Sequence, residues 1–307
     1  MEPESAVTTC YRHPKVESYV RCTRCERYIC PDCMREAAVG HQCVECVKEG
    51  ARSVRQARTV VGGKVAATPV LTCVLIGLNV LAYLGELVRP EIVDRFAMLG
   101  ARLVGPDGGH YVYVGGFPAG YHAEGLVAGE WERLLTGAFL HSPPAEGTFG
   151  IAHIVMNMLA LWQIGRVSEA LLGRVRYLAL YLLSALGGSV LELLIADPAA
   201  ESVGASGAIF GLGAAYYVLA RRMGGDLRQV NRFMGFLLLW LLISAGLTSW
   251  QGHLGGLLTG GLVTLAYAYA PRDGRRALVQ AGACVVVLAL LALCAWGKVA
   301  ELTSAAA

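Results

Sequence analysis

The sequence predicts an all-α polytopic membrane protein that carries a small zinc-binding domain at its N-terminus. Three observations lead to this fold class. Of the 307 residues, 55% are apolar and only 16% are charged, against about 25% charged in a typical globular protein. The apolar residues gather in runs long enough to cross a bilayer. Seven of the ten cysteines lie within the first 46 residues, in a polar segment.

The same composition excludes several classes of protein. A chain so poor in charge cannot cover a surface that faces water, which argues against a soluble enzyme, a disordered chain and a secreted disulfide scaffold. The net charge of +3 is too small, and the basic residues are too dispersed, for a protein that binds nucleic acid. The opening residues MEPESAVTTC contain no apolar stretch, so we expect no cleavable signal peptide.

Pairs of metal ligands, each separated by two residues, occur throughout residues 1–50. This spacing lets both side chains of a pair reach one ion, and the donors suffice for two tetrahedral, structural zinc sites. Metal binding would supply most of the folding energy of so small a domain. A disulfide framework is the alternative, but the predicted cytoplasmic location of the domain argues against it. The candidate ligands are Cys10, His13, Cys22, Cys25, Cys30, Cys33, Cys43 and Cys46.

We expect His41 to be a bystander, because the last cysteine pair is complete without it. The domain is expected to bind or position a cytoplasmic partner and not to catalyse a reaction.

Beyond a basic linker, residues 51–68, apolar segments alternate with short loops. A helix needs about 20 residues to cross about 30 Å of hydrocarbon. The segment 89–150 is much longer than an ordinary loop, so we expect it to be partly structured, interfacial and functional. We predict seven spans, near residues 69–88, 152–168, 176–196, 204–221, 232–247, 250–270 and 278–297.

The distribution of arginine predicts the orientation in the cell membrane. The linker and the loops that follow spans two, four and six contain several arginines, whereas the loops that follow spans three and five contain neither Lys nor Arg. Short loops rich in Lys and Arg remain in the cytoplasm. We therefore expect the N-terminus in the cytoplasm and the C-terminus outside.

Polar side chains occur at similar depth in three of the predicted spans. His153 and Asn157 are four residues apart in span two, Ser206 lies among small residues in span four, and His253 precedes a series of glycines in span six. All three spans enter from the outer side, and the serine and both histidines fall within about the first four residues, at about 1.5 Å per residue. A lone serine in a span is usually a packing residue. The joint occurrence favours one shared pocket, because polar groups in spans are costly and usually functional.

These motifs resemble those of the rhomboid family of intramembrane serine proteases. The resemblance extends over about residues 69–270 and rests on Gly204-Ala205-Ser206-Gly207, on the His153-x3-Asn157 pair and on His253 with its trailing glycines. Trp131-Glu132-Arg133 and Glu169 resemble the family's loop signatures. Two features depart from the family: Glu132 separates Trp131 from Arg133, and the stretch SPPAEGTFGIA between His141 and His153 is longer than usual.

The N-terminal segment resembles a B-box-type zinc finger, and its position ahead of the core resembles an arrangement found in actinobacterial rhomboids. In a B-box the first and third ligand pairs share one ion, and the second and fourth share the other. Sequential pairing remains an alternative.

The resemblance implies a six-helix protease core at 69–270, with residues 271–307 adding a seventh helix and a tail. Ser206 would attack the scissile carbonyl and His253 would take its proton. No carboxylate is suited to orient His253, because Glu192 lies elsewhere in span three. The remaining expected site residues are His153 and Asn157 as oxyanion donors, Gly204 and Gly207 for close approach of the substrate backbone, and Phe210 against the imidazole.

The expected activity is endopeptidase cleavage of single-pass transmembrane proteins near the outer membrane face, in the lipid bilayer. Two structural Zn²⁺ ions are expected in the N-terminal domain and none in catalysis. A catalytically inactive rhomboid-like protein that binds membrane helices is the alternative, although such relatives have usually lost the serine and the histidine. A transporter would need polar residues near span centres and inverted repeats, and the sequence contains neither.

Overall fold

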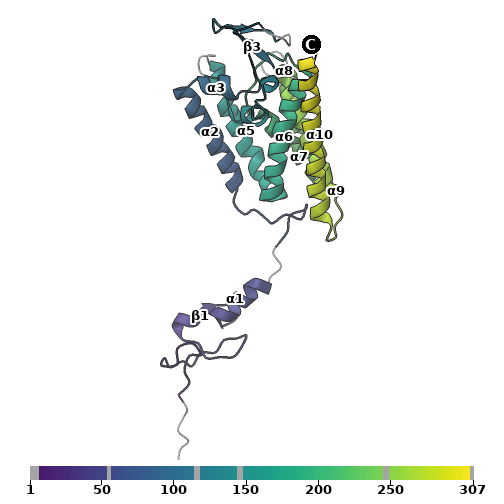
Figure 1. Cartoon of the computed structure of the whole chain (residues 1–307). Helices are drawn as coiled ribbons and strands as arrows, with labels where there is room; N and C mark the ends of the chain where they lie inside the picture. Colours follow the sequence, from purple (N-terminus) through teal and green to yellow (C-terminus); the bar gives the residue numbers. More distant parts are fainter. Residues whose placement is uncertain (1–6, 54–56, 114–117, 144–147, 245–248, 305–307) are drawn as a thin grey trace, which may run out of the picture. The chain divides into compact units, whose positions relative to one another are not determined.

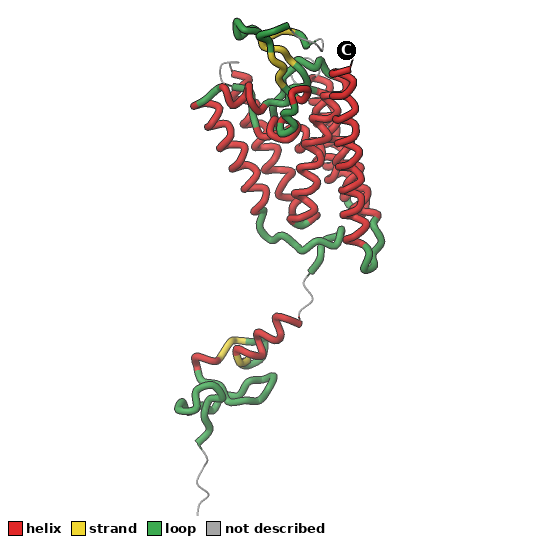
Figure 2. Tube along the Cα trace, viewed as in Figure 1, coloured by secondary structure: helices red, strands yellow, loops and turns green. Residues whose placement is uncertain are grey.

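The computed structural model describes residues 7–53, 57–113, 118–143, 148–244 and 249–304. The chain divides into two compact units, Met1–Ala57 and Arg58–Ala307. The first is small and rich in cysteine, and the second is a bundle of long helices (Figures 1 and 2).

The cysteine-rich unit contains little regular structure. An antiparallel sheet pairs β1 (Met34–Glu36) with β2 (His41–Cys43), and helix α1 (Val44–Ser53) follows directly. A 3-10 turn, Pro31–Cys33, precedes β1. The buried centre consists of cysteines and Ile29 instead of large apolar side chains. A unit with so small a core requires another source of folding energy, such as bound metal.

Each predicted span corresponds to a long helix in the helical unit, and the helices lie side by side (Figure 1). Their bounds are α2 (Val70–Val88), α5 (Thr148–Leu172), α6 (Arg174–Ile195), α7 (Ser206–Met223), α8 (Leu227–Ser244), α9 (Trp250–Tyr269) and α10 (Arg276–Ser304). Among the described helices, α2, α6 and α10 are both long and apolar enough to cross a membrane by composition alone. The other long helices contain more polar and small residues, several of which line the site described below.

The segment between α2 and α5 is partly structured, as the sequence predicted. An antiparallel sheet in the order β4-β3-β5 lies at the end of the bundle where α10 terminates (Figure 1). Residues 144–147, within the lengthened stretch before α5, lie outside the described residues. The elements are α3 (Glu91–Phe96), β3 (Arg102–Val104), β4 (His110–Tyr111), β5 (His122–Glu124) and α4 (Arg133–Thr136), with 3-10 turns at Leu126–Ala128 and Gly137–Phe139.

Arg133 anchors this segment from inside. Its side chain is 1% exposed, and it donates to Glu130 Oε2 at 2.6 Å and to the Ala97 carbonyl at 2.9 Å. Burial disfavours the charge on Glu130, but the Gly125 amide and Arg133 outweigh it and hold the pKa of this carboxyl below its usual value. A buried arginine needs such partners, because an unpaired buried charge is strongly destabilising. Trp131, by contrast, is 40% exposed.

Helices α6, α7 and α9 form the centre of the bundle and touch through glycines. A Cβ added to Gly256 of α9 would overlap the carbonyl group of Gly207 on α7. A Cβ added to Gly260 would overlap the backbone of Gly211 in the same way. Small residues at both positions let the two backbones approach to direct contact, as is common between membrane helices.

The chain enters the bundle through a compact turn, residues 58–64, closed by an antiparallel bridge between Arg58 and Lys64. Val61 at its tip is fully buried and joins the main apolar core. Gln280 of α10 donates from its side-chain amide to the carbonyls of Val61, at 3.1 Å, and of Tyr267, at 3.0 Å. This part of the sequence-defined linker is therefore packed on the ends of α9 and α10.

The contact between glycines predicts that two nearby alanine substitutions in α9 change the free energy of unfolding by very different amounts. Gly256→Ala forces a methyl group into the α7 backbone, so we expect the free energy of unfolding to fall by about 2–3 kcal/mol, as for other overpacked sites. Gly261→Ala meets only the Ala214 methyl at 3.8 Å, an ordinary contact, and should be neutral or slightly stabilising. Denaturant unfolding in detergent micelles measures the stability of both variants. Equal losses of stability would contradict the close contact between α7 and α9.

Candidate active site and metal-binding clusters

Helix α7 begins at Ser206, and Gly204 determines how the chain enters it. Gly204 has φ +133°, a conformation that residues with a side chain rarely adopt. Its amide donates to the Gly137 carbonyl at 2.9 Å. A Cβ at this position would also lie 3.0 Å from the His153 ring. Glycine is therefore required here both by the backbone angle and by the space available.

The structure brings Ser206 and His253 into hydrogen-bond contact. Ser206 Oγ lies 2.8 Å from Nε2 of His253, which projects from α9 and is 3% exposed. The Phe210 ring, one turn further along α7, stacks on the imidazole with 4.5 Å between ring centroids and 8° between planes. The stack restricts rotation of the imidazole and keeps Nε2 directed at the hydroxyl group.

His153 and Asn157 reach the same place from α5, where both line a cavity together with Ser206 and His253. The Ser142 amide donates to His153 Nδ1 at 3.3 Å. In the neutral ring one nitrogen accepts and the other carries the proton, so Nε2 is the donor. Asn157 donates one of its two side-chain N–H bonds to the His153 carbonyl at 2.9 Å.

Gly207 lies at a contact between helices. A Cβ at Gly207 would be 3.1 Å from the Gly252 carbonyl oxygen on α9. The missing side chain therefore serves the approach of α7 and α9, which brings the serine and the histidine together.

Two cavities meet at the Ser206–His253 pair. The first, of about 40 Å³, is lined by the pair and by polar side chains that include Glu192, Ser202 and Ser249. One water needs about 10–15 Å³ on this measure, so the cavity has room for a few. The second, of about 300 Å³, is apolar and opens between α5 and α8, with Trp240 among its lining residues.

Glu192 lies closer to the pair than the sequence indicated. It was expected elsewhere in the third span, but its carboxylate accepts from Ser202 Oγ at 2.5 Å and lines the small polar cavity. The sequence contained one signal, a carboxylate inside an apolar span. That signal alone could not place Glu192 at the site, because the sequence does not show which face of α6 meets α9. Ser202 and Ser249, which also line the cavity, lie in loops and were missed for the same reason.

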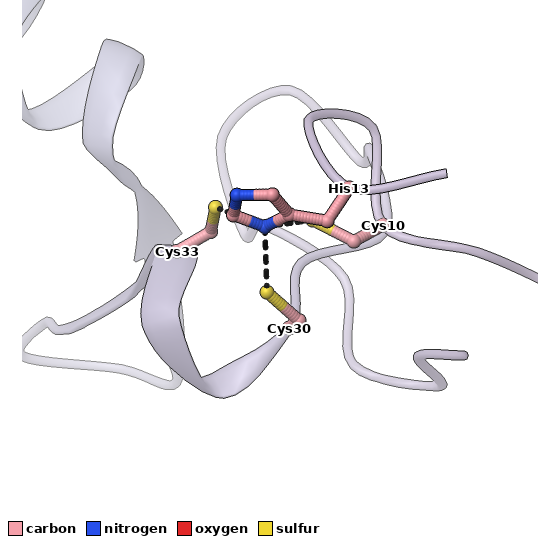
Figure 3. Close-up of side chains that lie close together, drawn as sticks. All are labelled: Cys10, His13, Cys30 and Cys33. Atoms are coloured by element: carbon pink, nitrogen blue, oxygen red, sulfur yellow. Dashed lines mark hydrogen bonds between the residues drawn. The ribbon is translucent and has the colours of Figure 1, made fainter. Parts of the chain in front are cut away.

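The cysteine-rich unit brings its eight candidate ligands into two groups. Within each group the ligand atoms lie within 4.8 Å of one another, and either group could hold a metal ion. Figure 3 shows the first group around the His13 ring, whose Nδ1 is 3.2 Å from Cys30 Sγ. The groups are Cys10, His13, Cys30 and Cys33, and Cys22, Cys25, Cys43 and Cys46.

The geometry and the chemistry of both groups fit a tetrahedral metal site. Cys25 Sγ and Cys43 Sγ are 3.8 Å apart, and two thiolates bound at about 2.3 Å to one tetrahedral ion must be about 3.8 Å apart. Burial opposes ionisation of every buried thiol. At Cys10 and Cys22 backbone amides outweigh it and lower the thiol pKa to about 6, whereas burial raises the pKa of Cys33 to about 11 and that of Cys46 to about 12. All ten cysteines are free thiols.

The ligand pairs alternate between the two groups, first with third and second with fourth, which is the arrangement implied by the B-box resemblance and not sequential pairing. His41 lies in β2, outside both groups.

Comparison with known proteins identifies a Rhomboid domain over residues 128–271. The chain is 36% identical over 156 residues to the rhomboid protease GluP of Bacillus subtilis, covering 48% of this chain and 28% of GluP. It is 31% identical over 145 residues to YdcA of the same bacterium, covering 46% of this chain and 69% of YdcA. The rhomboid protease AarA of Providencia stuartii is 28% identical over 190 residues, which cover 53% of this chain and 64% of AarA.

This chain thus spans about a quarter of the length of GluP and about two thirds of YdcA and AarA. The matched domain includes α5 to α9 and with them Ser206, His253, His153 and Asn157, whereas the cysteine-rich unit and α10 lie outside it. The seven apolar or partly polar helices, the polar site at their centre and the relatives agree: this chain belongs to the rhomboid family of membrane proteins.

Proposed function

We propose that this protein is an intramembrane serine endopeptidase that cleaves transmembrane helices near the outer membrane face. Family membership supports protease chemistry at a coarse level, because the relatives include named rhomboid proteases. The observation that carries the specific proposal is the 2.8 Å contact between Ser206 Oγ and His253 Nε2 in a buried polar cavity.

In the proposed mechanism, Ser206 is the nucleophile. Its Oγ attacks the scissile carbonyl carbon while its proton passes to His253 Nε2. His253 then returns this proton to the leaving amine, and water hydrolyses the acyl-enzyme by the same steps. The stack with Phe210 supports this role, since it holds the imidazole in the plane that the transfer needs. The small polar cavity beside the pair can supply the water.

The proposed oxyanion donors are His153 Nε2, the Asn157 amide and the Ser206 backbone amide. The hydrogen bond from Ser142 supports the assignment of His153, because it leaves the proton on Nε2, which lies beside Gly204 as the Ser206 hydroxyl group does. Donors that are already oriented before the reaction stabilise the developing charge without reorganisation. No metal is required for this chemistry.

The proposed substrate is a single-pass membrane protein whose helix unwinds near its outer end. The apolar cavity between α5 and α8 supports this proposal, since it connects the serine with apolar side chains that include Met156 and Phe236. An unwound backbone in a membrane lacks hydrogen-bond partners. Small and helix-destabilising residues at the cleavage site should therefore be preferred.

For the orientation we propose a cytoplasmic N-terminus and an outer C-terminus in the cell membrane. The arginine-rich loops support this proposal, and in the folded bundle α5, α7 and α9 start at one end, with the polar site near these starts. We also propose that both cysteine groups bind Zn²⁺ in a structural role and that the cytoplasmic unit positions a partner. The two complete sets of four ligands support the zinc assignment.

The nucleophile is tested by Ser206→Ala in liposomes with a single-pass substrate that carries helix-destabilising residues. We expect cleavage to fall by at least about 10⁴-fold, as when other serine proteases lose this residue. Ser168→Ala is the matched control, because Ser168 is buried at the opposite end of α5. Labelling by a fluorophosphonate probe should disappear in Ser206→Ala alone. Undiminished cleavage by Ser206→Ala would refute the mechanism, and a folded wild type that neither cleaves nor labels would indicate an inactive helix-binding member.

The oxyanion role of His153 predicts a loss of kcat with little change in KM. Removal of one donor typically costs about 10²–10³-fold in kcat, and we expect this loss for His153→Ala. His153→Gln retains an N–H donor and should recover part of the rate. Steady-state kinetics in micelles measures both variants. An unchanged kcat in His153→Ala, with the fold intact, would exclude the role.

The zinc assignment predicts two Zn²⁺ ions per chain by elemental analysis of the purified full-length protein. Cys30→Ser and Cys43→Ser each remove one ligand from a different group, so each should lower the zinc content by at least one ion. His41→Ala should retain both ions. Loss of zinc in His41→Ala, or a wild type that binds no zinc after purification under reducing conditions, would contradict the assignment.

A further inference from the structure

Four arginines gather at the end of the bundle where α6 and α10 begin. Arg176 binds Gln280, Gln280 binds the Val61 carbonyl and Arg276 binds the neighbouring Val60 carbonyl, and the charges of Arg176, Arg222 and Arg272 repel that of Arg276. Within the described part of the chain none of the four forms an ion pair. Neighbouring arginines at this end do: Arg174 pairs with Glu169 and Arg275 pairs with Asp273. The four guanidinium groups, here called the arginine cluster, therefore lack a counter-ion from these acidic residues.

Hydrogen bonds hold three members of the cluster in place. Arg176 Nε donates to Gln280 Oε1 at 2.7 Å, and Arg276 donates to the Val60 carbonyl. Arg222 Nε donates to the Ala268 carbonyl at 3.4 Å, with its guanidinium 5.4 Å from the Tyr269 ring. In the described structure Arg276 Nε is buried without an acceptor.

Orientation in the membrane alone does not account for this arrangement. Retention of a loop in the cytoplasm depends on the number of positive charges and not on their geometry. Exposed arginines such as Arg221, Arg228 and Arg232 meet that requirement at the same end of the bundle. Positive charges that are fixed side by side without a partner are instead typical of a site for an anion, and guanidinium groups match the oxygens of a phosphate.

An apolar groove of about 360 Å³ runs between α6 and α10, and its first α6 residue, Ala179, lies about one helical turn beyond Arg176. Its α6 residues lie three to ten positions beyond Arg176, or about 5–15 Å along the helix, which is the depth of one leaflet of hydrocarbon. The lining includes Ala179, Leu182 and Leu186 from α6, and Cys284, Val285 and Leu288 from α10.

We propose that the arginine cluster and this groove form a binding site for one anionic phospholipid. The phosphate of the headgroup lies among the four guanidinium groups, and one acyl chain lies between α6 and α10. Charge complementarity selects the headgroup, since basic pockets between membrane helices bind anionic lipids. The apolar groove distinguishes a lipid from free phosphate. The bound lipid joins α6, α10 and the 58–64 turn, whose Val60 carbonyl contacts Arg276.

The test is native mass spectrometry of the full-length protein in micelles, titrated with phosphatidylglycerol or with phosphatidylcholine. We expect the wild type to retain phosphatidylglycerol preferentially. The double variant Arg222→Gln/Arg272→Gln should bind it at least about tenfold more weakly, at about 1 kcal/mol per arginine. Arg275→Gln is the matched control, because Arg275 is adjacent but already paired with Asp273, and should bind as the wild type does.

A second variant, Ala179→Phe, fills the groove without changing a charge and should also weaken binding. Thermal unfolding in the absence of anionic lipid verifies that each variant is folded. Equal retention of the two lipids by the wild type, or equal weakening by Arg275→Gln, would overturn the proposal. If inorganic phosphate alone stabilised the protein against thermal unfolding, and Ala179→Phe did not change this effect, the ligand of the site would be a free anion and not a lipid. The measurement requires no protease activity, so its outcome is independent of whether the proposed function is correct.

Discussion

The close contact between the backbones of α7 and α9 is the constraint on which the site depends. Here the serine and the histidine come from two helices that are nearer to one another than ordinary side chains would allow. Gly207, Gly211, Gly256 and Gly260 remove the atoms that would keep them apart. The hydrogen bond between Ser206 and His253 is therefore a consequence of packing at positions without side chains.

Carboxylates from distant parts of the chain satisfy the backbone at other points of the bundle. Pro69 precedes α2 and offers no side-chain cap, and Glu169 of α5 accepts instead from the amides of Leu71 and Thr72. Glu86 near the end of α2 accepts from the His141 amide where the chain approaches α5. In apolar surroundings an unpaired amide is costly, so these acidic residues connect α2 to the rest of the bundle.

The sequence predicted the helices well: each predicted span corresponds to a long helix, although polar and small residues interrupt the apolar runs of α5, α7 and α9. It also predicted, from charge and length, that Ser206, His153 and His253 share one pocket, and all three line one cavity in the structure. The sequence could not show which faces of the helices meet. For this reason Glu192 was expected away from the site, whereas it lines the cavity beside Ser206 and His253. The pairing of the cysteines came only from resemblance, because spacing alone permits both alternating and sequential arrangements.

The 58–64 turn illustrates the same limit. A basic segment with two glycines is typical of a linker, yet Val61 is fully buried. Its carbonyl accepts a hydrogen bond from Gln280, which lies more than two hundred residues away in the sequence. Contacts of such sequence separation leave no periodic signal along the chain. In the sequence the arginines of the cluster were likewise visible only as charges that predict the orientation.

The hydrogen bond that orients His153 comes from the main chain of Ser142 and not from a side chain. Every amino acid except proline supplies that N–H group. Mutations at position 142 can therefore change the side chain without changing which nitrogen of the His153 ring carries the proton. Most single-codon changes at this position leave this part of the pocket intact.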